Sequence, residues 1–504
     1  MMKPRFNKLF TLLVIWRLAS VFIVQTSHVP DEYWQSLEVA HKLSFGYGYM
    51  TWEWQAGIRS YLYPFFLSIF YFIVKFVNAD FPLVIIFGPR VFQALLSAYA
   101  DYSFYTWTNS KLALLSLCVN WYWYYCATRT LINSFETCLT IIALSKYPWS
   151  GHQVKNTTFL WIVGFLCFAR PTATVFWLPL CLYHVWKNKY VMTWYLAIGL
   201  FYLIISTLID SMCYGRFTLS PLEFFKINVL NKVSEQYGKM HGLWYLFSGL
   251  PVLLGINYCI LPLVVYKVIS NGNNYQKSLL FTVTIVCSLV IYSLIGHKEF
   301  RFILPLLPML IFVINETIFQ ERVGKTKKKL FVFTLIVSNV FPGIYFSVLH
   351  QKGPLEIMSH LRNDLETMRN SEVDILFLTT CHATPYYSHL HRNVSMRFLT
   401  CEPNLKSSKD YIDETDKFRR NPMNWLEINY LNNRNIARLP SHVVIDDSII
   451  DKVEPFLRHY IRLIYCEDTH FAQHGEFNGY VIYKHHTIKS FDSDKSKKHN
   501  SAEF

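Results

Sequence analysis

Four carboxylates gather soon after the first apolar stretch of the chain. Asp31, Glu32, Glu38 and Glu53 fall within 23 residues and make up four of the thirteen acids in residues 1–350. Pro30 suits the first turn of a helix, which predicts that Asp31 and Glu32 stand at a helix N-terminus. The helix dipole there keeps a carboxylate ionised, as a general base requires. The competing interpretation is that these acids only cap an interfacial helix.

The neighbours of these acids favour a site for a sugar or a lipid head group. Gln35 and Glu38 are spaced to share one face of a helix. Trp34, Trp52 and Trp54 supply flat aromatic surfaces of the kind that bind the C–H faces of sugars and that gather at membrane interfaces. Acids and aromatic side chains together therefore predict a binding site for carbohydrate or head group.

A second charged group lies far along the chain at 297–302, where His297, Lys298, Glu299 and Arg301 stand close together. Two fixed cations and a histidine beside one acid can neutralise a phosphate. Taken alone, the run would equally suit an interfacial cluster with no chemical role. If both charged groups face the same side of a membrane, they fit a hydroxyl nucleophile and an anionic leaving group.

The composition indicates what must hold these residues in place. Hydrophobic residues make up 52% of the 504 positions and charged residues only 16%, against roughly 25% charged in soluble domains. Residues 1–350 hold 13 acids and 28 bases, whereas residues 351–504 hold 21 acids and 20 bases. We expect a multi-span helical body at 1–350, a soluble α/β domain at 351–489 and a disordered end at 490–504.

Eleven apolar stretches have about the length that crosses a bilayer. They are 8–25, 61–78, 83–100, 111–126, 129–146, 158–187, 190–209, 244–269, 279–296, 300–319 and 330–349. The stretch 158–187 is overlong and is interrupted at 170–171, so it predicts either one tilted helix or two. The first stretch predicts a signal anchor, because Arg17 splits it and no small-residue cleavage site follows.

Loop charges predict the orientation. The basic N-terminus and the basic loop at 322–329 should both face the cytosol, and the ten spans between them agree with that. Residues 26–60, the turn at 297–299 and the C-terminal domain then fall on the opposite, luminal side. The sequon that begins at Asn393 fits a luminal position.

The C-terminal domain shows four short β-branched runs, at 373–378, 442–445, 460–465 and 480–483. Helical or polar stretches separate them, which favours a small α/β layer. Three cysteines, Cys381, Cys401 and Cys466, would sit in an oxidising compartment. They allow one disulfide, with Cys381 and Cys401 the favoured pair, and leave at least one cysteine over.

Several functions are disfavoured. The net charge of +14 lies in the membrane body, where it suits head groups or topology better than nucleic acid. The histidines His382, His389 and His391 resemble metal spacing but have no carboxylate at a fitting distance, so we expect no metal and no cofactor. Lone charges inside the spans should pair or line a cavity; they are Arg17, Arg90, Asp101, Glu136, Arg170 and Asp210.

Several sequence runs carry a resemblance to a known family. The runs are 28–38, 49–54, 59–64, 128–131, 170–173, 297–302 and 381–389. Through them the chain resembles the dolichyl-phosphate-mannose-dependent mannosyltransferases of glycosyltransferase family 22. The 49–64 and 381–389 runs resemble the branch that builds GPI anchors. One departure is 241–245, where relatives carry a Trp-rich stretch.

The resemblance implies a polytopic membrane protein of the GT-C fold with its site in the lumen of the endoplasmic reticulum. It implies transfer of the third mannose, in α1,2 linkage, from dolichyl-phosphate-mannose to a GPI-anchor precursor. The expected substrate-binding residues are Gln35, Glu38, Trp52, Glu53, Trp54 and Arg59.

The expected mechanism is an inverting transfer with one carboxylate base. Asp31 removes the proton of the acceptor hydroxyl, and Glu32 orients it or shares its role. His297, Lys298 and Arg301 stabilise the departing phosphate. Two alternatives stay open. One is a sister enzyme that elongates the dolichol-linked oligosaccharide of N-glycans, and the other is a polytopic transporter.

Overall fold

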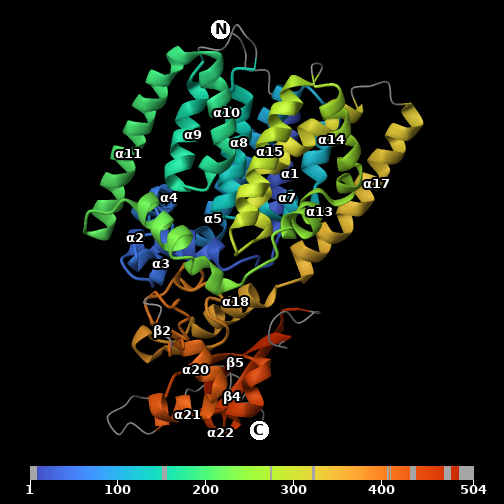
Figure 1. Ribbon diagram of the computed structural model, residues 1–504. Coiled ribbons are helices and arrows are strands. Elements are labelled where there is room, and N and C mark those ends of the chain that lie inside the picture. The colour runs from blue at the N-terminus through green and yellow to red at the C-terminus, as the bar shows by residue number, and fades with distance from the viewer. Residues whose placement is uncertain are drawn as a thin grey trace.

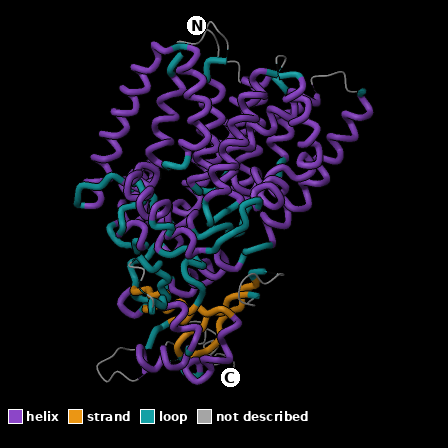
Figure 2. Tube along the Cα trace, viewed as in Figure 1, coloured by secondary structure: helices purple, strands orange, loops and turns teal. Residues whose placement is uncertain are grey.

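The computed structural model describes residues 8–149, 156–272, 275–319, 324–405, 408, 410–431, 439–469 and 478–486. A bundle of helices forms one end of the molecule, and a smaller unit that contains a β-sheet forms the other (Figure 1). Among the described residues all strands fall in that smaller unit, while the bundle consists of helices and connecting loops (Figure 2).

The bundle is built from helices of very different lengths. They are α1 (Lys8–Ile23), α4 (Leu62–Phe76), α5 (Pro82–Thr108), α6 (Lys111–Val119), α7 (Trp121–Cys126), α8 (Ile132–Lys146), α9 (Thr158–Ala169), α10 (Ala173–Lys187), α11 (Met192–Tyr214), α13 (Leu250–Leu254), α14 (Leu261–Ser270), α15 (Gln276–Leu294), α16 (Leu307–Ile314) and α17 (Lys325–Ile344). Within the described ranges, six helical segments are long and apolar enough to cross a membrane.

Helix α4 does not cross the bundle, contrary to the expectation for 61–78. Helices α1 and α5 are antiparallel. Arg17 in α1 contacts Asp101 in α5, whereas Val24, which comes after Arg17, accepts a hydrogen bond from Arg90, which comes before Asp101. The loop after α1 and the start of α5 therefore lie at the same end of the bundle, and α4 begins and ends there.

The overlong stretch 158–187 forms two helices, α9 and α10, which lie side by side in Figure 1. Phe159 near the start of α9 contacts His184 near the end of α10, with 5.3 Å between the ring centres, so the two helices are antiparallel. Pro171 lies at the break, where it cannot continue α9. The sequence predicted one crossing at 61–78, which α4 does not make, and the stretch 158–187 makes two crossings instead of one. The number of crossings between the N-terminal end of α1 and the start of α17 therefore stays even, and both lie at the same end of the bundle.

Buried charges in the bundle are paired, as expected. Arg17 and Asp101 form an ion pair of 2.7 Å with both side chains fully buried. Arg170, at the break between α9 and α10, pairs with Glu136 of α8. The carboxylate of Asp210, near the end of α11, accepts a hydrogen bond of 2.7 Å from the backbone amide of Tyr61, the residue before α4. Each pairing offsets the cost of a charge in an apolar layer.

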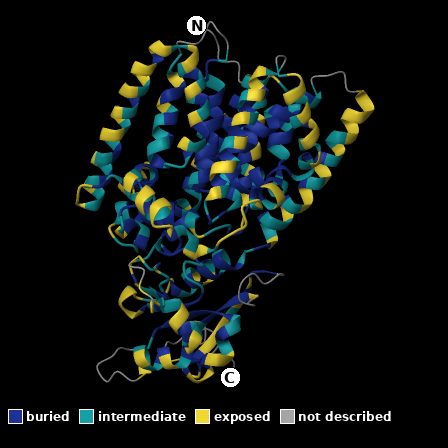
Figure 3. Ribbon diagram, in the orientation of Figure 1, coloured by how far each residue is buried: buried dark blue, intermediate teal, exposed yellow. Residues whose placement is uncertain are grey.

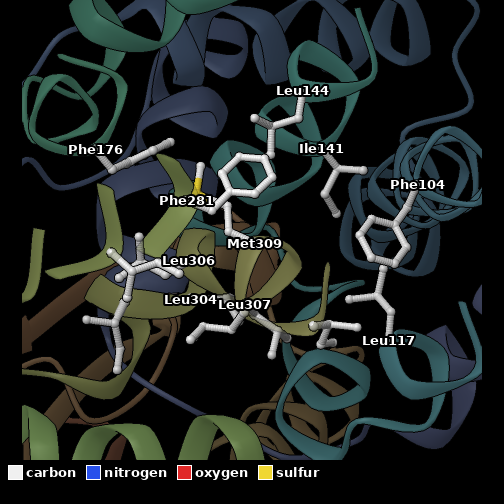
Figure 4. Packing of buried hydrophobic residues seen from close by; sticks show 14 of the residues in the cluster. Phe104, Leu117, Ile141, Leu144, Phe176, Phe281, Leu304, Leu306, Leu307 and Met309 are labelled. Carbon is white, nitrogen blue, oxygen red and sulfur yellow. The ribbon is translucent and has the colours of Figure 1, made fainter. Parts of the chain in front are cut away.

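The interior of the bundle is apolar and closely packed, while the outward faces of its peripheral helices are exposed (Figure 3). Figure 4 shows Phe104, Ile141, Leu144 and Phe281 converging from helices α5, α8 and α15. A surface of exposed apolar side chains around a closed apolar interior suits lipid on the outside.

The loop between α1 and α4 carries three short helices, η1 (Tyr33–Leu37), α2 (Glu38–Phe45) and α3 (Trp52–Gln55). Helix begins at Asp31, directly after Pro30, whose carbonyl accepts from the amide of Trp34 at 3.0 Å. The prediction that Asp31 stands at a helix N-terminus is confirmed. This loop and the end of the bundle that holds it face the smaller unit in Figure 1.

The smaller unit holds a five-stranded mixed sheet in the order β2-β1-β3-β5-β4. Its strands are β1 (Asp374–Leu378), β2 (Ser395–Phe398), β3 (His442–Asp446), β4 (Tyr460–Glu467) and β5 (Gly479–His485), and its helices include α18 (Gly353–Leu365), α19 (Tyr387–Leu390), α20 (Glu414–Arg420), α21 (Pro422–Leu426) and α22 (Glu454–Leu457). Strands β2, β1 and β3 are parallel, and β5 pairs antiparallel with β3 and β4.

The four predicted strands are confirmed as β1, β3, β4 and β5, and β2 is additional. Strand β2 has four residues and lies at the edge of the sheet, with most of its side chains not buried. It contains no β-branched residue, so the β-branched runs did not predict it. The expected disulfide between Cys381 and Cys401 is present. Asn393 is exposed just before β2. The expectation of a disordered end at 490–504 lies outside the described residues.

The Arg17–Asp101 pair gives a test of the bundle. Asp101→Asn should lower the free energy of unfolding in detergent by about 3–5 kcal/mol, because it leaves Arg17 charged in an apolar interior. Calorimetry or denaturant unfolding measures the change. The matched control is Glu223→Gln, because Glu223 pairs with Lys226 at the surface and should cost less than about 1 kcal/mol. Equal stability of the two variants would contradict the assigned role.

Candidate active site

One guanidinium joins the two charged groups that the sequence singled out. Nη2 of Arg301 lies 2.6 Å from Oδ2 of Asp31. Nε and Nη2 of the same side chain donate to the two carboxylate oxygens of Glu299, each at 2.6 Å. The Arg301 side chain is 6% exposed and that of Asp31 is 27% exposed. Asp31 is therefore accessible to solvent, whereas Arg301 is buried and held by Glu299.

His297 completes this group from the turn before η8 (Phe300–Leu306). Its Nε2 lies 3.1 Å from Oε1 of Glu299. Burial by itself would raise the pKa of Glu299, but Arg301 and His297 lower it below its ordinary value. Glu299 is thus ionised and holds the guanidinium in place beside Asp31.

A further acid and base, Glu53 and Arg59, lie near Asp31. Arg59 donates to Oε1 of Glu53 through Nη2 at 2.6 Å and Nε at 3.2 Å, and Gln35 donates to Oε2 of Glu53 at 3.0 Å. Burial lowers the pKa of Arg59, but Glu53 and then Asp31 raise it above its ordinary value. Arg59 is therefore a second cation within the field of Asp31, and Gln35 and Glu53 fix its position.

Two aromatic rings, Trp52 and Tyr237, lie between Glu53 and His297 in a series of ring contacts. Trp52 stacks on Tyr237 with 6.4 Å between ring centres, and Tyr237 meets His297 at 6.3 Å. Tyr237 ends η5 (Val233–Tyr237), a segment that sequence reasoning did not select. The rings form a wall beside the charged residues, of the kind that contacts the C–H face of a sugar.

Glu32 differs in its surroundings from its neighbour Asp31, which it was expected to orient or to assist as a base. Its carboxylate is 3% exposed and lies 2.9 Å from Nη1 of Arg129. Arg129 also donates to the carbonyl of Thr26 at 2.7 Å. This buried pair anchors the loop that carries Asp31, which fits the orienting role better than that of a second base.

The chain is similar to known mannosyltransferases along nearly its whole length. A model of the Alg9-like mannosyltransferase family matches residues 8–391. GPI mannosyltransferase 3 of Drosophila melanogaster is 43% identical, over 93% of this chain and 83% of its own length. GPI alpha-1,2-mannosyltransferase 3 of Homo sapiens is 36% identical, over 97% of this chain and 88% of its own length.

The chain belongs to the Alg9-like mannosyltransferase family. It is therefore a mannosyltransferase. A solved structure of ArnT from Cupriavidus metallidurans, bound to undecaprenyl phosphate, aligns with a TM-score of 0.57 at 11% identity and covers 94% of this chain and 97% of that one. That likeness shows the GT-C fold, and with the six apolar helices it makes this mannosyltransferase a multi-pass membrane protein.

Three residues expected to bind substrate or phosphate in the mannosyltransferase have other partners. Lys298 is 3% exposed, and its Nζ donates to the carbonyl oxygens of Ile295 at 2.6 Å and Met240 at 3.3 Å. Trp54 is 2% exposed and its Nε1 donates to the carbonyl of Trp34. Both hold loops together around the site instead of facing it.

Glu38 is the third such residue, and it binds the C-terminal unit. Its Oε1 accepts from the amides of Tyr386 and Ser388 at 2.8 and 3.1 Å and from the Ser388 hydroxyl at 2.6 Å. One turn later, Nε2 of His41 lies 3.0 Å from Nδ1 of His391. Helix α2 thus clamps the segment at 386–391, which contains α19, and these bonds occupy one carboxylate oxygen of the residue that was expected to bind substrate.

Of the three histidines whose spacing resembles that of metal ligands, His382 lies beside two cysteines. Ligand atoms of Cys381, His382 and Cys401 lie within 4.8 Å of one another, but the two cysteines are joined in a disulfide. Neither sulfur is then a thiolate, the form that binds zinc. The geometry is that of a histidine beside a disulfide and does not suit a metal.

The clamp predicts a pH dependence of docking. Burial raises the pKa of Glu38 to about 7 from its ordinary value of 4.5, so docking favours the protonated acid. Glu38 should favour docking most below about pH 4.5 and contribute less as the pH rises to about 7. Burial lowers the pKa of His41 to about 3 and also lowers the pKa of His391, so these histidines weaken docking as the pH falls below about 6.5. Glu38→Gln keeps an accepting oxygen and removes only the contribution of the acid, so wild-type docking should fall relative to that of the variant as the pH rises from about 4.5 to about 7.

Hydrogen exchange at 381–391, corrected for the intrinsic effect of pH, measures the docking. Glu223→Gln, an exposed acid on the bundle side, is the control and should keep the wild-type profile. A ratio of wild-type docking to Glu38→Gln docking that stays constant between pH 4.5 and 7 would refute the assignment.

Proposed function

We propose that the chain transfers the third mannose, in α1,2 linkage, from dolichyl-phosphate-mannose to the second mannose of a GPI-anchor precursor. The reaction would take place on the luminal face of the endoplasmic reticulum membrane. The family and the names of the two GPI mannosyltransferases support the acceptor. The observation that carries the mechanism is the contact between Asp31 and Arg301, which places a carboxylate and a cation at one point.

Asp31 is the general base. It is a partly exposed acid at a helix N-terminus, with the guanidinium of Arg301 as its partner. It takes the proton of the acceptor 2-hydroxyl as that oxygen attacks C1 of mannose. The bond from C1 to the phosphate oxygen breaks, and the sugar inverts through an oxocarbenium-like state. Glu32 and Arg129 hold the loop in register for this step.

Arg301 and His297 receive the departing dolichyl phosphate. Among the described residues, Nη1 of Arg301 makes no hydrogen bond, so its N–H groups can bind a phosphate oxygen while Nη2 stays on the carboxylates. The electron pair of the broken bond leaves with the phosphate, where the guanidinium stabilises the added charge. Lys298 stabilises the turn that positions Arg301. Arg59 is the cation near Asp31 that would lie beside the sugar.

The sister reaction on the dolichol-linked oligosaccharide of N-glycans is the second candidate, since the family model is named for Alg9. The lipid that accumulates when the gene is removed separates the two reactions. A two-mannose GPI intermediate supports the proposal, whereas a truncated lipid-linked oligosaccharide supports the alternative.

Removing the base tests the mechanism. Asp31→Asn should lower transfer from dolichyl-phosphate-mannose to a synthetic dimannosyl glucosaminyl-inositol lipid by about 10²–10⁴-fold, since an amide cannot accept the proton. Protein abundance should stay normal, because Arg301 keeps Glu299 as its partner. Glu223→Gln is the matched control. Substantial transfer by Asp31→Asn would refute the base assignment.

Cation chemistry gives a second test. Side-chain cations suffice for a single phosphate in this proposal, so transfer by the purified protein should be unchanged in excess EDTA. Arg301→Lys should in contrast lose activity strongly, since an ammonium cannot hold Glu299 in a fork and reach a phosphate as well. Activity that EDTA removes and a divalent cation restores would contradict this account.

A further inference from the structure

His382 approaches the site from the C-terminal unit, held by strong constraints. It follows Cys381, which is bonded to Cys401, and its backbone has a φ of +59°, in the left-handed region that non-glycine residues rarely adopt. Its ring lies 4.7 Å from Trp34 and 5.2 Å from Phe398 between centres. Strained backbone held this firmly is characteristic of functional positions.

The disulfide fixes which ring nitrogen carries the proton. Nδ1 of His382 lies 3.4 Å from Sγ of Cys381 and 4.0 Å from Sγ of Cys401. A disulfide sulfur has no hydrogen to donate, so Nδ1 must be the donor in these contacts. The neutral ring then has its lone pair on Nε2, which makes no hydrogen bond with any residue that the structure describes and is not closed off from solvent.

The lone pair lies in the neighbourhood of the base. Trp34, which the imidazole contacts, is three residues after Asp31 on the same helical segment. Burial lowers the pKa of His382 to about 4, against the opposing effect of the Asp31 carboxylate. The ring is neutral at physiological pH, so it offers an acceptor and no positive charge to a phosphate.

We infer that His382 is a specificity residue for the acceptor sugar, and that its Nε2 accepts a hydrogen bond from the hydroxyl next to the one that Asp31 deprotonates. This inference rests on the proposed function. Two acceptor groups, the Asp31 carboxylate and the His382 nitrogen, would then recognise a pair of neighbouring hydroxyls. Donor phosphate binds on the cationic side at Arg301 and His297, whereas a neutral acceptor of hydrogen bonds suits an uncharged sugar.

The experiment compares two acceptors that differ in one hydroxyl. One is the synthetic dimannosyl glucosaminyl-inositol lipid, and the other lacks the 3-hydroxyl of its terminal mannose. Wild-type protein should use the deoxy acceptor roughly ten- to a hundredfold less efficiently in kcat/KM, the effect of one buried hydrogen bond. His382→Ala should lose that factor with the normal acceptor and then treat both acceptors alike.

Further variants separate recognition from folding. His382→Asn, whose side-chain oxygen can accept, should restore part of the discrimination. His360→Ala removes an exposed histidine from α18 of the same unit and should leave both rates unchanged. The KM for dolichyl-phosphate-mannose and the pH profile set by Asp31 should not change in any of these proteins.

The outcomes are distinct. Wild-type protein that transfers mannose to neither acceptor would overturn the proposed function. Wild-type protein that transfers to both equally well, or a His382→Ala variant that keeps the wild-type discrimination at reduced rate, would overturn the role of His382 alone. Because the wild-type comparison needs no variant, a folding defect in His382→Ala does not remove the test.

Discussion

The guanidinium of Arg301 bridges two carboxylates, and the rest of the site is built around that bridge. It joins the loop after α1 to the turn before η8, about 270 residues further along the chain. Glu299 binds it through two hydrogen bonds, so the weaker single contact to Asp31 leaves that acid reachable from solvent. A lone charge at this depth would be costly, and one cation shared between two acids offsets that cost.

The four clustered acids divide into one exposed group and three that hold the structure. Glu32, Glu38 and Glu53 each have fixed partners: Arg129, the backbone at 386–388, and Arg59. Asp31 alone combines an exposed position with a single contact. Their residue types are nearly the same, so the division arises from burial and from the partners that folding brings to each.

The C-terminal unit contributes to the site as well as covering it. Helix α2 clamps the 386–391 segment, and His382 and the disulfide partner Cys381 lie just before that segment in the chain. Docking of this unit and completion of the acceptor side of the site are then one event. A polar loop held by a buried acid and two histidines gives an orientation that apolar packing alone would leave less defined.

The sequence by itself determined the helical membrane body, four of the five strands, the helix start at Asp31 and the two charged runs that meet. Those features follow from local composition, periodicity and proline chemistry, which act within a few residues. Only the tertiary structure decided that α4 stays at one end of the bundle, that Glu32 and Lys298 are buried with other partners, and that His382 packs against Trp34 near Asp31. Such outcomes depend on which distant atoms surround a side chain, and burial and pairing are set by contacts across the whole chain.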